Sequence, residues 1–389
     1  MTAGVWQRAT ALLATAACGL LPPPFLGPAA MPGPPDDGIA RIRSDQWHLR
    51  YLKTGEAHQI SQGDGVVVAV LDTGVDAHPD LAGNLLGGVD LTAEGNRDGR
   101  TDRDSHGTSM AGLIAAHGRT GTTGALGIAP KAKLLPVRFA IDHLTGDTGG
   151  LARSIDYSVS QGARVISISM AGHPDIELQR SVAAAVRADV VVVAGTGNRP
   201  GEDRVAFPAA YPDVITVGGI DRSGEIASIS VAGSEVDVVA PAVDIYSTSI
   251  GGNYSKGTGT SSATAIVAGA AALIRAEHPH LPRNEVAHRL TATAIDKGPP
   301  GRDDQYGYGV IDIVAALTAD VPPLGFESTA PDASSTPPAS AQAQPDEDGN
   351  TATTRGLVTL GVIVVAGGAW AVIVRRRRQS DDPPPRVSR

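Results

Sequence analysis

Asp72, His106 and Ser261 each stand in a glycine-marked turn, and their side chains are those that nucleophilic catalysis requires. A serine hydroxyl is inert unless a base removes its proton, and a histidine held by a carboxylate can be that base. Taken singly, each residue has a simpler interpretation, as a turn cap, a helix cap or a surface histidine. Taken together, they predict a site that attacks a carbonyl carbon.

The sequence around each of these residues suits its predicted role. Asp72 closes the apolar run 66–71 and precedes a Thr-Gly turn, which keeps a carboxylate near the rim of a sheet. His106 begins a Gly- and Ala-rich helix, whose N-terminus disfavours a charged imidazole and so suits a base that starts neutral. Ser261 precedes an Ala-rich helix whose first N–H groups can face a developing oxyanion.

Three sequence blocks around these residues resemble the subtilase family: VAVLDTGVD at 68–76, HGTSMAG at 106–112, and GTS at 259–261 with VAG at 267–269. The order Asp, His, Ser along the chain is also that of the subtilisin triad. The resemblance implies a serine endopeptidase that hydrolyses peptide bonds through an acyl-enzyme, with Asp72, His106 and Ser261 as its catalytic residues. Ser262 is a rival nucleophile, but counting back from the VAG block favours Ser261.

Two further segments resemble parts of the family's substrate site. The valine run and GTGN turn at 190–198 resemble the segment that carries the oxyanion-hole asparagine, which implies that Asn198 donates to the oxyanion. An asparagine in a glycine-rich turn is also common without such a role. The strand that leads to Ser169, Met170 and Ala171 resembles the substrate-binding strand, along which a peptide would add as a further strand.

The chain departs from the family pattern at three positions close to these residues. Ala171 stands where glycine is usual, and Ser262 and Ala265 replace the usual methionine and proline. The departures affect the expected shape of the substrate pocket and of the oxyanion hole.

Alternating strand-like and helix-like stretches could position these residues. Val- and Ile-rich runs suited to strands buried on both faces cover 65–71, 132–139, 164–169 and 190–194. Apolar residues at helical spacing cover 107–117, 151–161 and 177–187. The pattern predicts an α/β fold, a subtilisin-like doubly wound, mainly parallel sheet with helices on both faces. Reactive side chains collect at the carboxyl ends of such strands.

Composition restricts the class of protein further. The net charge is -9, with no basic face outside a run of arginines near the C-terminus, so nucleic-acid binding is not expected. Aromatic residues are 4% of the chain while glycine occurs 47 times, which predicts an interior packed by small side chains.

The single cysteine, Cys18, excludes an intramolecular disulfide. Cys18 as a lipid-attachment site is an alternative that its surroundings disfavour.

Residues 1–30 have the pattern of a secretory signal peptide. A positive residue precedes an apolar run, three prolines at 22–24 end any helix, and small residues near Ala30 suit cleavage. Residues 31–60 form an extension expected to pack on the peptidase domain, which covers 61–320. The extension is too short for the folded inhibitory propeptide that secreted subtilases often have.

The C-terminal part predicts a membrane anchor. A Pro-, Ala- and Ser-rich linker covers 321–355, and 356–374 is a run of nineteen residues without a charge. As a helix it is about 28 Å long, which matches the hydrocarbon thickness of a bilayer. Four arginines follow at 375–378, so the tail 375–389 is expected in the cytoplasm and the peptidase domain outside the cell membrane, in a single-pass topology.

This order of segments resembles the mycosins, the membrane proteases associated with type VII secretion. The resemblance implies proteolytic processing of a restricted peptide or protein substrate, and a type VII secretion complex as a partner. The alternative is a catalytically dispensable structural component that stabilises such a complex.

No cofactor is expected for this chemistry. Asp98, Asp102 and Asp104 form an acidic cluster that could ligate calcium or could be a solvated loop ahead of His106, and the sequence favours the loop. No metal site is therefore predicted.

Overall fold

The computed structural model describes residues 36–93, 95, 98–143 and 146–325, with side chains from residue 39 onward. The predicted signal peptide, most of the linker, the span at 356–374 and the basic tail lie outside these residues. Within the described part of the chain, no helix is both long and apolar enough to cross a membrane.

A parallel sheet of seven strands forms the centre of the described structure, in the order β2-β3-β1-β4-β5-β6-β7. Its strands are β1 (Val67–Asp72), β2 (Val89–Asp90), β3 (Lys133–Arg138), β4 (Val165–Ile168), β5 (Val191–Gly195), β6 (Ile215–Ile220) and β7 (Val238–Pro241). Nearly every residue in these strands is buried, as expected for a sheet covered on both faces. β8 (Ile245–Thr248) and β9 (Tyr254–Gly257) form a separate antiparallel pair.

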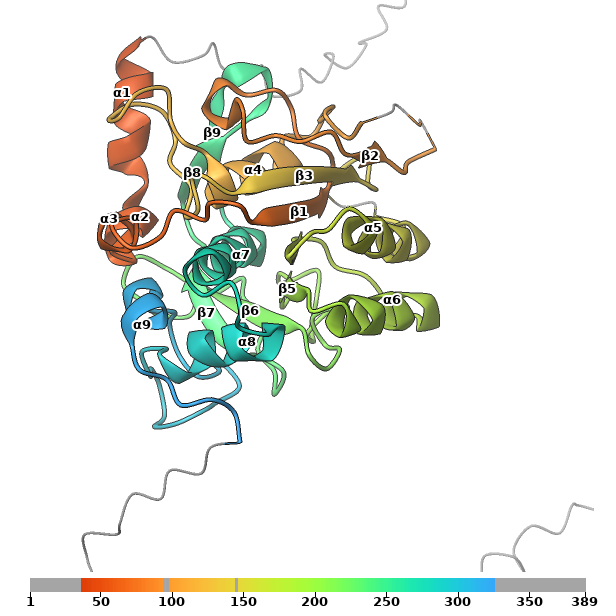
Figure 1. Ribbon diagram of the computed structural model, residues 1–389, viewed down its shortest axis with the longest axis vertical. Helices are drawn as coiled ribbons and strands as arrows, with labels where there is room; N and C mark the ends of the chain where they lie inside the picture. The colour runs from red at the N-terminus through yellow and green to blue at the C-terminus, as the bar shows by residue number, and fades with distance from the viewer. Residues whose placement is uncertain (1–35, 94, 96–97, 144–145, 326–389) are drawn as a thin grey trace, which may run out of the picture. The chain divides into compact units, whose positions relative to one another are not determined.

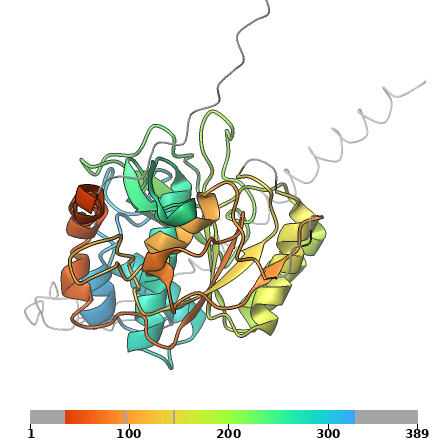
Figure 2. The ribbon, with the colours of Figure 1, turned by 90° about the horizontal axis from the view of Figure 1, so that it is seen from above.

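Helices cover both faces of the sheet (Figures 1 and 2). The helices are α1 (Asp36–Asp45), α2 (Trp47–Tyr51), α3 (Thr54–Ala57), α4 (His106–Ala115), α5 (Thr148–Ser160), α6 (Ile176–Arg187), α7 (Thr260–Glu277), α8 (Arg283–Ala292) and α9 (Ile313–Thr318). Side chains alternate along β1, so Val68 and Val70 join the core under α4 and α7, whereas Ala69 and Leu71 join the core under α5 and α6. The predicted mainly parallel α/β sheet is confirmed.

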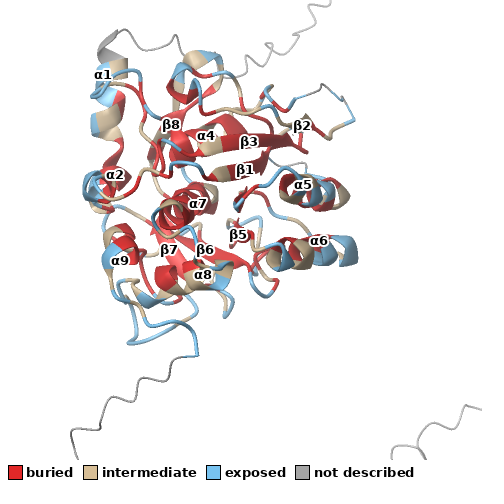
Figure 3. Ribbon diagram, viewed as in Figure 1, coloured by how far each residue is buried: buried red, intermediate tan, exposed pale blue. Residues whose placement is uncertain are grey.

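α7 is the most deeply buried helix, as Figure 3 shows. Its many alanines and its glycine allow close packing, since a Cβ at Gly269 would lie 2.7 Å from the Cβ of Ile128. A larger residue at Gly269 would therefore push α7 away from the segment around Ile128. This approach fixes the middle of α7 against the segment around Ile128.

The N-terminal segment α1–α3 packs against the sheet domain. Trp47 is buried and donates its indole N–H to the carbonyl of Val243 at 3.0 Å. The amide of Gln46 bonds the backbone of Leu126 in both directions and the carbonyl of Tyr246. These contacts join the extension to the β8 region and to the loop before β3.

Candidate active site

Asp72 is the last residue of β1, at the carboxyl edge of the sheet, and its side chain is 1% exposed. Its Oδ1 accepts hydrogen bonds from the backbone N–H of Thr73 at 2.8 Å and from Nδ1 of His106 at 2.7 Å. Within the described residues its Oδ2 has no hydrogen-bond partner. A carboxylate in this position holds the imidazole in the Nδ1–H tautomer, which leaves Nε2 free to accept a proton.

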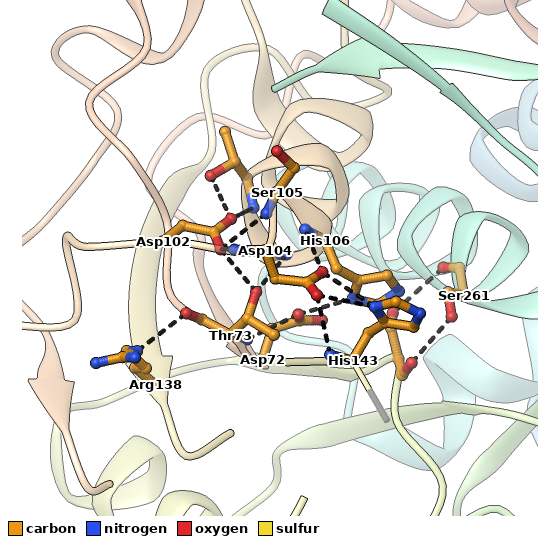
Figure 4. A network of polar contacts seen from close by, with 12 residues as sticks. Asp72, Thr73, Asp102, Asp104, Ser105, His106, Arg138, His143 and Ser261 are labelled. Atoms are coloured by element: carbon orange, nitrogen blue, oxygen red, sulfur yellow. Dashed lines mark hydrogen bonds and ion pairs between the residues drawn. The ribbon is translucent and has the colours of Figure 1, made fainter. Parts of the chain in front are cut away.

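Asp102 and Thr73 fix the start of α4 beside the end of β1 (Figure 4). Asp102 accepts five hydrogen bonds, from the Thr73 hydroxyl, the backbone N–H groups of Asp104 and Ser105, and both the N–H and hydroxyl of Thr108. The Thr73 hydroxyl in turn accepts from the N–H of Gly107 at 3.0 Å. Asp102, considered from the sequence as a calcium ligand, is therefore the group that orients the helix carrying His106.

No three His, Cys, Asp or Glu side chains gather as a metal site would need, in the part of the chain that the structure describes. Of the acidic cluster, Asp98 is exposed beside Arg100, with 3.9 Å between carboxylate and guanidinium. The carboxylate of Asp104 lies 2.9 Å from Nδ1 of His143.

The surroundings of His106 change its protonation. Burial alone would lower the pKa of His106, but the charge and hydrogen bond of Asp72, with the charges of Asp104 and Asp102, raise the pKa above its ordinary value of 6.5. From the position of His106 at a helix N-terminus we expected a disfavoured imidazolium, which means a lowered pKa. This expectation is wrong in sign. The three carboxylates together outweigh the effect of burial.

Ser261 is the second residue of α7 and lies in the same cleft as His106. Its hydroxyl donates to the carbonyl of Ser169 at 2.9 Å, so attack requires one side-chain torsion to turn the hydroxyl toward His106. Ser262, the rival nucleophile, is only 4% exposed, with its side chain inside the domain. The structure therefore presents Ser261, and not Ser262, to the cleft.

Asn198 also lines this cleft, three residues after β5. Its Oδ1 accepts a hydrogen bond from the backbone N–H of Thr260 at 2.9 Å, which identifies the oxygen of this amide and leaves its N–H groups to donate elsewhere. The N–H of Ser261 belongs to the first turn of α7, where N–H groups have no intrahelical partner. Two donors thus flank the place where a carbonyl oxygen would develop charge.

The cleft has a volume of about 240 Å³ and is lined by most of the predicted site residues. His106, Ser169, Met170, Ala171, Asn198 and Ser261 line it, and Asp72 is buried behind His106. Residues from five separate segments therefore converge at the carboxyl edge of β1, β4 and β5. Sequence reasoning did not identify two further titratable lining residues, His143 and Glu202.

A model of the subtilase family matches residues 63–309 of the chain, well over half of its length. The chain belongs to the subtilase family. Subtilisin E of Bacillus subtilis (strain 168) is 40% identical over 284 residues, 72% of this chain and 70% of that protein. Subtilisin Savinase of Lederbergia lenta is 35% identical over 280 residues, 72% of this chain and 97% of that protein.

Solved structures of mycosins are also similar to this subtilase. MycP1 from Mycobacterium smegmatis has a TM-score of 0.63 and 30% identity, covering 71% of this chain and 85% of its own. The MycP3 protease from the type VII (ESX-3) secretion system has a TM-score of 0.62 and 33% identity, covering 70% and 88%. The protein is a subtilisin-like serine protease with a mycosin-like structure.

His143 of this subtilase stacks on the ring of His106, with ring centroids 5.8 Å apart and planes at 21°. Its Nδ1 lies 2.9 Å from an oxygen of Asp104, and the other oxygen of Asp104 accepts the backbone N–H of His106 at 3.2 Å. His143 comes from the loop after β3, so only tertiary structure brings the two rings together. No sequence motif marks it.

A buried ion pair supports the turn after Asp72 in this subtilase. Arg138, the last residue of β3, lies beside Asp72 in the β1–β3 register. Its Nη1 is 2.7 Å from Oδ2 of Asp90, its Nε donates to the carbonyl of Thr73 at 3.2 Å, and both charged side chains are fully buried. Arg138 thus holds the backbone carbonyl of Thr73, and the hydroxyl of Thr73 orients the start of α4.

Arg138→Met is expected to lower the free energy of unfolding by about 3–5 kcal/mol, because it leaves the Asp90 carboxylate buried without its main cation. Urea unfolding of the full-length protein in detergent measures this. The double variant Arg138→Met/Asp90→Asn should recover part of the loss. Lys131→Met, which breaks the exposed pair with Asp64, is the control and should cost about 1 kcal/mol or less. Equal losses in the two single variants would contradict the role of the buried pair.

Proposed function

We propose that this subtilase is a membrane-anchored endopeptidase that cleaves peptide bonds through an acyl-enzyme on Ser261. The observation that carries the proposal is the 2.7 Å hydrogen bond from His106 to buried Asp72, at a cleft that also holds Ser261 and Asn198. A serine, a polarised base and oxyanion donors are the three parts that acyl transfer needs.

In the proposed reaction, Nε2 of His106 takes the proton of Ser261 as the hydroxyl oxygen attacks the scissile carbonyl. Asp72 stabilises the imidazolium that forms, and the amide of Asn198 with the N–H of Ser261 stabilises the oxyanion. The imidazolium then gives its proton to the leaving amine, and the C–N bond breaks. Water, activated by the same imidazole, hydrolyses the ester and frees the serine. No step requires a cofactor.

The substrate is a peptide in an extended conformation. Ser169, Met170 and Ala171 follow β4 along one side of the cleft, where a peptide backbone can pair with them as an added strand. The side chain before the scissile bond, called P1, would then enter the cavity between these residues and the segment 195–198.

The pH dependence of kcat/KM tests the role of His106. The protonated imidazole cannot accept the Ser261 proton, so the rate should fall as the pH drops through the folded-state pKa of His106, which lies above 6.5. Asp104→Asn removes one of the charges that raise this pKa and should move the acid limb to lower pH. Asp98→Asn, an exposed change in the same loop, should leave the limb in place. If the acid limb of the Asp104→Asn profile stayed at the same pH, the assignment of His106 as the base would be contradicted.

For the anchor, we propose a single-pass cell-membrane protein with the peptidase domain outside. The uncharged run 356–374 and the arginines at 375–378 support this proposal. Full-length protein should stay in the membrane after carbonate extraction, and a variant ending at residue 355 should be released. Full-length protein in the soluble fraction would contradict the anchor.

The type VII association is proposed from the similarity to mycosins, one of which is described as an essential component of the type VII (ESX-1) secretion system. In the cells that produce the protein, loss of secretion in both Ser261→Ala and a deletion of 40–374 would favour the protease role. Secretion that stops only in the deletion would favour the structural alternative.

A further inference from the structure

Glu202 lines the predicted substrate cleft but has no part in the reaction described above. Its backbone N–H donates to the carbonyl of Asn198 at 3.0 Å, which closes the turn 198–202 and returns the chain over Gly197. Gly197 has φ +104°, and a Cβ at this position would lie 3.0 Å from Cγ of Glu202. The stem of Glu202 therefore lies against Gly197, next to the oxyanion donor.

No described residue supplies a charged partner to the carboxylate of Glu202. Among the residues that the structure describes, none forms an ion pair or side-chain hydrogen bond with it, although the residue is only partly exposed. The cationic side chains nearest in sequence, Arg199 and Arg204, are exposed. The two other titratable residues lining the cleft are His106 and His143, and each already has an aspartate partner.

Glu202 lines the part of the cleft that a P1 side chain would enter. A peptide paired with Ser169–Ala171, with its scissile carbonyl at Asn198, directs P1 into the space beside Gly195 and Gly197. Both glycines line the cleft, and the positions that their Cβ atoms would take already lie against Thr264 and Glu202. Met170 and Ala171 offer an apolar wall for a methylene stem, and Glu202 lines the same cleft beside Gly197.

We propose that Glu202 determines specificity at P1, so that this subtilase prefers lysine or arginine before the cleaved bond. This inference rests on the proposed function of the cleft. A long side chain with a terminal cation buries its stem on the apolar wall and pairs its charge with the carboxylate. An anionic P1 residue is repelled, and a neutral one leaves the carboxylate without a partner in a cleft from which substrate excludes water.

The test uses full-length protein in detergent and peptides that differ only at P1, with lysine, methionine or glutamate. The ratio of kcat/KM for the lysine peptide to that for the methionine peptide should be about tenfold in favour of lysine, as for a charge-assisted hydrogen bond. Glu202→Gln should reduce this ratio to within about twofold of unity, because the amide is similar in shape but lacks the charge.

Asp203→Asn is the matched control, since it removes the same charge from the neighbouring exposed residue, and should keep the ratio of the unchanged protein. Added salt should also lower the ratio in the unchanged protein, because ions screen the exposed part of the pair. Equal ratios in the unchanged protein and Glu202→Gln, or a preference for methionine, would overturn the proposal.

A binding measurement separates this inference from the proposed function. Ser261→Ala cannot form the acyl-enzyme, and its affinity for fluorescent lysine and methionine peptides can be measured by anisotropy. Tighter binding of the lysine peptide that is lost in Ser261→Ala/Glu202→Gln supports the P1 role even if the unchanged protein cleaves no peptide. Equal affinities would overturn the P1 role even if peptides are cleaved.

Discussion

Ser261→Ala is expected to lower kcat for peptide hydrolysis by about 10⁶-fold, the order of loss that a subtilisin shows when its nucleophile is removed. The methyl group cannot form the ester, so only the oxyanion donors and substrate binding remain. Progress curves with a fluorogenic peptide measure the loss, and circular dichroism of the variant should match that of the unchanged protein.

Ser262→Ala is the control for this variant, because Ser262 is adjacent in sequence but buried within the domain. Its activity should stay within about tenfold of the unchanged protein, as expected for a small substitution outside the reacting atoms. A large loss in Ser262→Ala with a small one in Ser261→Ala would reverse the assignment of the nucleophile.

Asp72→Asn is expected to lower kcat by about 10⁴-fold near neutral pH, as the equivalent change does in a serine protease triad. In the 2.7 Å contact, Oδ1 of Asp72 accepts a hydrogen bond from Nδ1 of His106, and an amide nitrogen there would favour the opposite tautomer. Nε2 would then hold a proton and could not accept that of Ser261.

Asp76→Asn provides the comparison, since Asp76 follows in the same loop and bonds the N–H of Gly251 instead of His106. Its kcat should remain close to that of the unchanged protein. If both variants lost activity equally, the loss would reflect the loop and not the orientation of the imidazole.

The strands that hold the site were predictable because they are rich in valine and isoleucine and buried on both faces. The boundary of β1 was the main difference, since Asp72 was placed after the strand but pairs in register with Arg138. β6 was not predicted because it contains Gly218-Gly219, a pair that weakens any strand signal. β2 has two residues, too few for a periodic pattern.

The predicted catalytic and oxyanion residues each lie in a local motif, and the structure brings His106, Asn198 and Ser261 to one cleft with Asp72 buried behind His106. The residues that orient them could not be found in this way. Asp102 accepts five hydrogen bonds only after β1 and α4 meet, and His143 reaches His106 from a loop thirty-seven positions later in the sequence. Such contacts depend on tertiary structure, which one sequence does not reveal.

Arg138 illustrates the same limit of local patterns. In the sequence it lies within the predicted strand 132–139 and has no visible partner, because Asp90 lies on a different strand, β2, at the edge of the sheet. Only the parallel register of β2 and β3 places the two charges 2.7 Å apart.

The central claim is that Ser261 is an activated nucleophile, and the most direct test is to map the residue that a fluorophosphonate modifies in the full-length protein. We predict that mass spectrometry will find one modified residue, Ser261, and that modification will stop peptide hydrolysis in proportion to labelling. Labelling of Ser262 or another serine, or no labelling of a folded protein that still cleaves peptides, would contradict the account.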